Sequence, residues 1–282
     1  MTEAVEYRAY RRVEEARAKG RPTGRDYIDN LISNFTEFHG DRRFGDDAAV
    51  VSGIGRLRNM PITVIATDKG RTTKEKVAHN FGSPHPEGYR KALRQMKLAE
   101  KFHRPVLCIV DTAGAYPGIG AEERGQAQAI AENLMAMMSL KTPVISLFIG
   151  EGGSGGALAL AVADRVFMME NAVYSVISPE GCASILWKDA KKMKEAAECL
   201  KLTAQDLMAL GVAERVISEP ENFREETRQA KQVYYRLEDL LYEEFQWLRK
   251  KSEEELLAQR YERFRKFGRP DSEQRADCQA GQ

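Results

Sequence analysis

The sequence predicts an α/β protein organised around a parallel sheet, and two repeated features lead to this prediction. Two short runs, Pro105 to Val110 and Pro143 to Ile149, are apolar, rich in β-branched residues and free of charge, which is typical of strands buried on both faces of a parallel sheet. A glycine-rich loop follows each run, at 111–120 and 150–156, and a helical pattern follows each loop. We therefore expect both loops at the carboxyl ends of neighbouring strands, where open α/β sheets bind ligands.

The residues before these strands form an extension that we expect to be helical over 1–45. Residues 3–18 are charged and helix-prone, and Thr23 is a suitable cap for a second helix. Apolar residues recur there at helical spacing: Tyr27, Ile28, Leu31, Ile32 and Phe35. From Ala48 the pattern changes to a β-hairpin, with strands at 48–57 and 61–67. This hairpin opens the main domain, expected over residues 46–220.

A long polar connection, 69–88, follows the hairpin and precedes a helix at 89–102. It carries four cations, Lys69, Arg71, Lys74 and Lys76. Long connections inside compact domains are usually functional or mobile. The cations are either a solvated loop or a phosphate-binding patch, and the second interpretation would suit a CoA-type ligand or a partner.

The remaining elements follow the same logic. Helices are expected after the glycine loops at 121–139 and 157–163, then a strand at 165–169, an extended run at 173–177, helices opened by Ser178 and Thr203, and a last strand at 212–217. Charged helices are expected over 221–267, with a capping box at Ser252 and one apolar stripe that docks on this domain or on another chain. Residues 268–282 have the composition of a disordered tail.

Composition excludes several classes of function. The 43 basic and 42 acidic residues are nearly balanced, which gives no indication of nucleic acid or an anionic membrane as a partner. The apolar windows are short and interrupted and the first residues lack an apolar signal core, so we expect no transmembrane helix and a cytoplasmic location. The four cysteines form no Cys-x-x-Cys pair, and no metal site is expected on this chain.

The second glycine loop matches two short motifs. Ser154 lies in a G-x-S-x-G pattern, but a hydrolase elbow needs a histidine after the serine, and all four histidines precede it. Gly150, Gly152 and Gly155 match the G-x-G-x-x-G dinucleotide fingerprint, with Glu170 placed 20 residues after Gly150. This Rossmann-like module is the alternative function, although it leaves the loop at 111–120 without a role.

Two loops on neighbouring strands also suit an oxyanion hole. Backbone N–H groups from both loops would stabilise a developing negative charge by a few kcal/mol for each donor. A simpler interpretation is that the glycines only permit tight turns and close helix packing. Asp111 at the first strand end is either a base or, as we favour, a cap for backbone N–H groups. Glu122 and Glu123 are explained by the helix dipole alone.

Longer motifs carry a family resemblance. Residues 111–125, 149–159 and 174–188, together with 69–76, 80–82 and 86–92, closely resemble the α subunits of bacterial acetyl-CoA carboxylase carboxyltransferase. The resemblance extends over about residues 25 to 220. One departure is Ala113, where a proline is expected, and it leaves the backbone donors in place.

The resemblance implies a crotonase-like (Clp protease/crotonase) spiral of ββα units with helical extensions at both ends. It implies transfer of a carboxyl group from carboxybiotin, borne by the biotin carboxyl carrier protein, to acetyl-CoA, which yields malonyl-CoA for fatty acid biosynthesis. The implied partners are a zinc-bearing β subunit in an α2β2 heterotetramer, the carrier protein and biotin carboxylase.

The resemblance also implies a set of site residues. Backbone donors that stabilise the ureido oxyanion of biotin would come from Gly114 and Gly118 in the first loop and from Gly155, Gly156 and Ala157 in the second. The proposed substrate-binding side chains are the four cations of the polar connection and one aromatic residue: Lys69, Arg71, Lys74, Lys76 and Tyr116.

Overall fold

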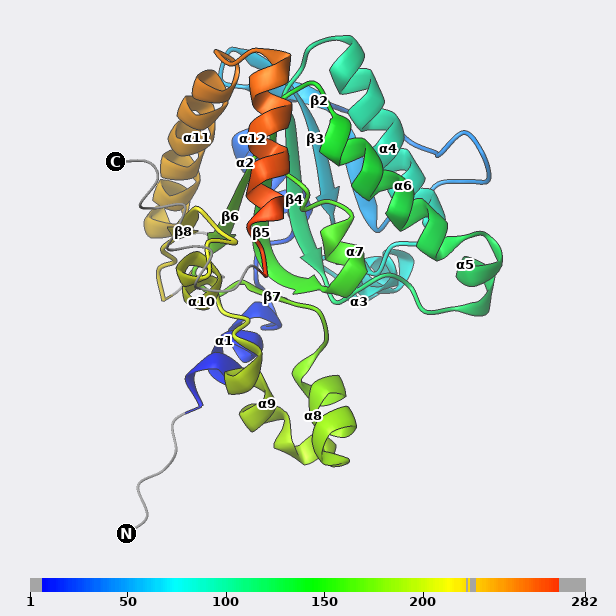
Figure 1. Cartoon of the computed structure of the whole chain (residues 1–282), viewed down its shortest axis with the longest axis vertical. Helices are drawn as coiled ribbons and strands as arrows, with labels where there is room; N and C mark the ends of the chain where they lie inside the picture. The colour runs from blue at the N-terminus through cyan, green and yellow to red at the C-terminus, as the bar shows by residue number, and fades with distance from the viewer. Residues whose placement is uncertain (1–6, 222, 224–226, 269–282) are drawn as a thin grey trace.

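The computed structural model describes residues 7–221, 223 and 227–268, and its centre is one twisted sheet (Figure 1). In the described residues the strand order is β1-β2-β3-β4-β5-β6-β8, with β7 paired to the end of β5. The strands are β1 Ser33–Glu37, β2 Val50–Leu57, β3 Met60–Thr67, β4 Val106–Thr112, β5 Val144–Gly153, β6 Arg165–Met169, β7 Val173–Ser175 and β8 Arg215–Ile217. The first three are antiparallel neighbours, and the pairings from β3 onward are parallel.

Helices cover this sheet in two packed groups. In one, α4 lies on β2 and β3 and packs against α6, which α12 also contacts; in the other, α2 lies on β1 to β4 and contacts α11. These helices are α2 Gly24–Leu31, α4 Pro86–Lys101, α6 Gln126–Ser139, α11 Arg228–Leu248 and α12 Glu253–Arg265. Their apolar faces and the strands share one core. No helix within the described ranges is long and apolar enough to cross a membrane.

A small helical arm projects from one end of the sheet (Figure 1). It consists of α1 Arg8–Ala16, α8 Pro179–Trp187 and α9 Met193–Leu200, which contact one another around two small apolar clusters. The short elements are α3 Thr73–Ala78, α5 Ile119–Glu123, α7 Ser154–Leu158, α10 Ala204–Ala209, η1 Asn80–Gly82 and η2 Ala190–Lys192. Strand β7 joins the arm to the end of β5, so the arm lies next to the second glycine loop.

Many of the expected elements are confirmed, including the hairpin, both apolar strands and the strand at 165–169. The predicted caps also form: the Ser178, Thr203 and Ser252 hydroxyls accept from backbone N–H groups of the first turns of α8, α10 and α12. The apolar stripe of α11 is buried in the core of this domain, which settles where it docks. The expected disordered tail lies outside the described residues, apart from Gly268.

Four expectations about local structure are wrong. Phe35 belongs to β1 rather than to a helix, so the stretch before residue 46 contributes a strand to the sheet. Residues 150–153 extend β5, and the following helix occupies 154–158 instead of 157–163. The helix expected at 121–139 is interrupted at Gly125, whose φ of 81° ends α5 and begins α6. The connection at 69–88 contains α3 and η1.

Candidate functional site

The two glycine loops touch each other, as the strand pattern predicts. Strands β4 and β5 pair in parallel, with Thr112 opposite Gly152 at their carboxyl ends. A Cβ atom on Gly153 would lie 2.0 Å from the Ala113 carbonyl oxygen, and one on Gly156 would lie 2.5 Å from the Ala115 nitrogen. Only glycine permits backbones to approach this closely. The loops therefore form a tight seam of backbone.

Local conformation also distinguishes the residues of this seam. Gly114 has a φ of 149°, which side chains disfavour, and its N–H donates to the Thr112 hydroxyl at 3.1 Å. Ser154 has a φ of 51° and begins α7, so Gly155, Gly156 and Ala157 occupy its first turn. The first N–H groups of a helix have no partner within the helix itself. Gly118 caps α5 at the far end of the first loop.

A buried ion network lies beside the seam. The Lys69 ammonium lies 2.7 Å from Asp111 Oδ1 and 2.9 Å from Glu151 Oε2. Asp111 Oδ1 also accepts the Glu151 backbone N–H at 2.8 Å, which ties the end of β4 to β5. Burial lowers the pKa of Lys69, but the two carboxylates outweigh it and hold that pKa above its ordinary value. Asp111 thus acts as the cap that we favoured rather than as an unpaired base.

Two arginines of the segment after α1 extend this network. Arg17 binds Glu151 and Glu180, each at 2.7 Å, and so connects the arm to the end of β5. Arg21 is buried against Glu219 at 2.6 Å and donates to the Ile149 carbonyl oxygen at 2.7 Å. For Glu151, burial raises the pKa, while Lys69 and Arg17 lower it to a net value below the ordinary range. The carboxylates near the seam are therefore charge-compensated.

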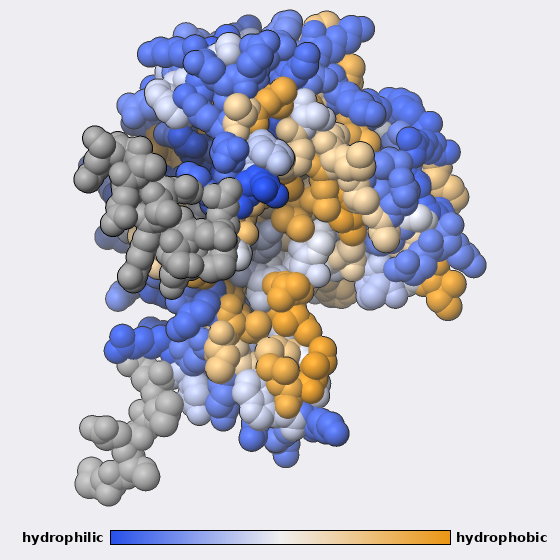
Figure 2. Space-filling view, viewed as in Figure 1, coloured by the Kyte–Doolittle hydropathy of each residue, from blue (hydrophilic) through white to orange (hydrophobic). Residues whose placement is uncertain are grey.

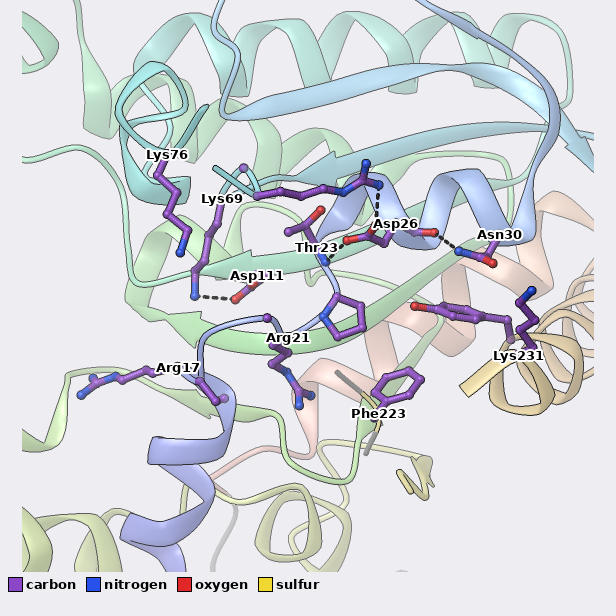
Figure 3. Close-up of a pocket in the computed structure, with 17 residues that line it drawn as sticks. Arg17, Arg21, Thr23, Asp26, Asn30, Lys69, Lys76, Asp111, Phe223 and Lys231 are labelled. Carbon is purple, nitrogen blue, oxygen red and sulfur yellow. Dashed lines mark hydrogen bonds and ion pairs between the residues drawn. The ribbon is translucent and has the colours of Figure 1, made fainter. Parts of the chain in front are cut away.

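A basic cleft of about 620 Å³ opens next to this network (Figure 3). It lies between residues 16–30, the turn after β3 and helix α11. Lys69 and Lys76 point in the same direction on one side of it, and Lys231 lies on the other. Arg71, half exposed at the rim, pairs with Asp26 and Asp29. In the described part of the chain, Lys76 and Lys231 make no ion pair.

The cleft thus unites three of the predicted substrate-binding residues, Lys69, Arg71 and Lys76, whereas the other two lie elsewhere. Lys74 is exposed on α3. Tyr116 lies in the first glycine loop, where its ring packs against that of His85 with 4.1 Å between centroids and the planes tilted by 32°. Its backbone is fixed as well, because the Tyr116 N–H donates to the Pro84 carbonyl oxygen at 3.0 Å.

Sequence reasoning missed several residues of this region. Glu151, Arg17 and Arg21 belong to the network, but no role was assigned to them. Glu151 had one available signal, since it is the only charged side chain within a loop of glycines and one serine. The two arginines had none, because their pairing partners lie 134 and 198 residues away in the chain.

The dinucleotide interpretation is not supported. Gly150 faces the Asp111 side chain, with its Cβ position 2.4 Å from Oδ1, and is not open to a phosphate. Helix α7 has five residues, too short for the crossover helix of a dinucleotide-binding unit. Glu170 pairs with Arg12 at 3.2 Å rather than lying free for a ribose. Among the described residues no group of His, Cys, Asp or Glu has an arrangement that could hold a metal ion.

Solved structures show which fold this is. The chain matches transcarboxylase 12S with a TM-score of 0.62 at 21% identity, over 78% of this chain and 43% of that chain. It matches a Pseudomonas malonate decarboxylase hetero-tetramer, solved in complex with coenzyme A, with a TM-score of 0.65 at 18% identity, over 93% and 98% of the two chains. The fold is the crotonase-type fold of carboxyltransferases.

Sequence relatives define the family. The family model described as acetyl co-enzyme A carboxylase carboxyltransferase-like matches residues 5–268. An acetyl-coenzyme A carboxylase carboxyl transferase subunit alpha from Ruminiclostridium cellulolyticum is 72% identical over 211 residues, 75% of this chain and 81% of that protein. One from Clostridium botulinum is 55% identical over 259 residues, 92% and 94% of the two chains. The chain belongs to the acetyl-CoA carboxylase carboxyltransferase family and is a component of a biotin-dependent carboxyltransferase.

Proposed function

We propose that this chain is the α subunit of a cytoplasmic carboxyltransferase that transfers the carboxyl group of carboxybiotin to acetyl-CoA, forming malonyl-CoA. The observation that carries this proposal is the seam between the two glycine loops, at the carboxyl ends of β4 and β5. The carrier protein with its carboxybiotin, and the biotin carboxylase that recharges it, belong to the same proposal.

The seam fits a ligand that becomes anionic. Carboxybiotin supplies the carboxyl group, and backbone N–H groups of this chain stabilise negative charge on the oxygen left behind. The proposed donors are those of Gly114 and Gly118 in the first loop and of Gly155, Gly156 and Ala157 in the second. The Gly114 N–H donates to the Thr112 hydroxyl in this structure, so it would have to leave that bond to serve the ligand. Donors fixed by a rigid backbone stabilise such charge without reorganisation. Because Lys69 compensates both Asp111 and Glu151, no uncompensated carboxylate there repels the ligand.

A β subunit is the proposed partner, in an α2β2 assembly. One relative, from Natranaerobius thermophilus, is named as carboxyl transferase subunits beta/alpha and is 53% identical over 260 residues, 92% of this chain and 43% of that protein. The arm next to the seam exposes Ile185 and Leu186, and the connection from β7 to it exposes Val176, each at least 66% exposed. Figure 2 shows apolar side chains gathered over the arm. A partner that covers this surface would also close the site.

The basic cleft is proposed to bind the phosphate groups of CoA. Lys76 is the available cation of the predicted set in the cleft, because Lys69 and Arg71 are each held by two carboxylates. Lys74 adds positive charge from α3, and Tyr116 is proposed to contact substrate at the first loop. A ligand with several phosphates gains from fixed cations in a partly enclosed cleft.

The test is reconstitution with the cognate β subunit. Biotin-dependent conversion of malonyl-CoA to acetyl-CoA, the reverse reaction, should occur in the mixture and not with either chain alone. Gly156→Ala should reduce kcat by about 100-fold or more, because its Cβ would push the loops apart and move the donors. Gly45→Ala is the matched control, since a Cβ there meets nothing within 4 Å. An inactive mixture that also forms no complex would refute the proposed function.

A further inference from the structure

One buried glutamine side chain joins helix α6 to the backbone of the first glycine loop. Gln126 is the first residue of α6 and is 4% exposed. Its Nε2 group donates to the Tyr116 carbonyl oxygen at 3.1 Å, inside the loop, and to the Pro84 carbonyl oxygen at 2.8 Å. The Tyr116 N–H donates to the same Pro84 oxygen at 3.0 Å. Gln126 therefore ties the middle of the loop to the segment that precedes α4.

This preceding segment is itself anchored to the main domain. The N–H of His85, the residue after Pro84, donates to the buried Asp47 carboxylate at 2.7 Å. Two residues further on, Glu87 is buried and binds the Arg124 guanidinium at 2.7 Å. The Pro84 carbonyl oxygen thus belongs to a fixed part of the chain. Through Gln126, that part supports the first glycine loop.

The supported residue lies midway between the proposed donors of the loop. Gly114 and Gly118 are each two positions from Tyr116. The Thr112 hydroxyl holds the start of the loop, because it donates to the Gly114 carbonyl oxygen at 2.9 Å. Both backbone polar groups of Tyr116 are bonded outside the loop, the N–H to Pro84 and the carbonyl oxygen to Gln126. The middle of the loop therefore depends on this pair of contacts.

The donor end of Gln126 is the part of the side chain that the structure uses. Both groups that it faces are carbonyl oxygens, and only the NH2 of an amide can donate to them. The Oε1 atom is buried without a hydrogen-bond partner among the described residues. An apolar side chain would avoid the cost of that buried oxygen, but it would leave the Tyr116 carbonyl oxygen without this donor. Packing alone thus does not account for a glutamine here.

We propose that Gln126 is a positioning residue that holds the first glycine loop through the Tyr116 carbonyl oxygen and so aligns the backbone donors of that loop. Displacing a preorganised donor weakens stabilisation of the transition state more than binding of the substrate. The expected signature is therefore a fall in kcat with little change in KM. This inference rests on the proposed role of the two loops.

The experiment compares Gln126→Met with Gln95→Met. Gln95, on α4, is also buried, at 0% exposure, and makes no hydrogen bond to either glycine loop in the described structure. Each variant replaces one buried amide by a side chain of similar length. Amide hydrogen exchange over residues 112–120 is measured on the purified chain. Kinetics of malonyl-CoA to acetyl-CoA conversion are measured in the complex with the β subunit, with melting temperature and complex formation as checks.

A second variant, Gln126→Asn, covers the case in which Gln126→Met does not fold. It keeps the buried amide but is one methylene shorter, so it cannot reach both carbonyl oxygens. It should have the same effect on the loop as Gln126→Met.

The Gln126 variants should lower kcat about tenfold with KM within about twofold of wild type. They should also accelerate exchange in the first loop, and Gln95→Met should do neither. A kcat within twofold of wild type, unchanged exchange in the loop, or an equal loss in Gln95→Met would overturn the inference. Inactivity of the wild-type complex would instead count against the proposed function, and the exchange comparison would still decide whether Gln126 holds the loop.

Discussion

Two cations make ion pairs at opposite ends of β5, and their surroundings differ. Before β5 begins, Arg260 of α12 binds both Asp164 oxygens at 2.8 Å and donates to the carbonyl oxygens of Met137, Leu140 and Thr142. At the other end, Lys69 binds two carboxylates beside the cleft. Every N–H of Arg260 is used and the residue is 0% exposed, whereas Lys69 is one-fifth exposed. Arg260 therefore stabilises the fold, whereas Lys69 neutralises negative charge beside the candidate site.

The largest effect on stability is expected when Arg260 is replaced. Arg260→Leu should lower the free energy of unfolding by about 3–5 kcal/mol, because it leaves the Asp164 carboxylate buried without its partner. Denaturant unfolding of the purified chain measures this. Activity per folded complex should stay near wild type, since Arg260 lies at the amino end of β5, away from the glycine loops. A loss of activity in fully folded protein would break the comparison.

Lys69→Met should reduce activity more than it reduces stability. It leaves Asp111 without its cation and Glu151 with Arg17 alone, with a cost of about 1–3 kcal/mol after allowance for partial exposure. Activity should fall by more than stability explains, because the added negative charge lies beside the seam. Steady-state kinetics and unfolding of the same preparation separate the two effects. If activity survives in the folded variant, the network is structural like Arg260.

Arg17→Ala tests the contribution of a more exposed cation than Arg260 or Lys69. The Arg17 side chain is 36% exposed, so losing its bonds to Glu151 and Glu180 should cost only about 0.5–1 kcal/mol. The arm should loosen locally, which amide hydrogen exchange in α8 would detect. Unchanged exchange there would show that the apolar clusters alone hold the arm.

The smallest effect is a pH dependence at His79. Its Nδ1 lies 2.9 Å from Asp68 in an ion pair, and the closeness of that carboxylate raises the pKa of His79. A raised folded-state pKa gives stability that is fully present below the unfolded pKa of about 6.5 and lost as pH rises through the folded value. His79→Gln should therefore lower Tm more at about pH 6 than at about pH 9. An equal shift in Tm at both pH values would contradict this.

Short-range patterns predicted much of this molecule. Uncharged β-branched runs locate β4 and β5, and the glycines after them predict the seam, because period and composition report burial directly. Strand β1 escaped prediction since it lies at a sheet edge and its side chains are mostly exposed. The pairing of Lys69 also escaped, because its carboxylates come from other strands and nothing local distinguishes it from the solvated Lys74. Gln126 was expected only as part of a helix.

The contacts of Arg260 also determine when the chain can finish folding during its synthesis. Residue 260 must reach back 96 positions to Asp164 and 123 to Met137 near the end of α6. Until α12 has left the ribosome, the carbonyl oxygens of Met137, Leu140 and Thr142 lack this donor, and α12 does not yet cover the amino end of β5. Contacts so distant in sequence form late because closing their loops costs entropy. Helix α12 therefore completes the packing at the amino end of β5 late in folding.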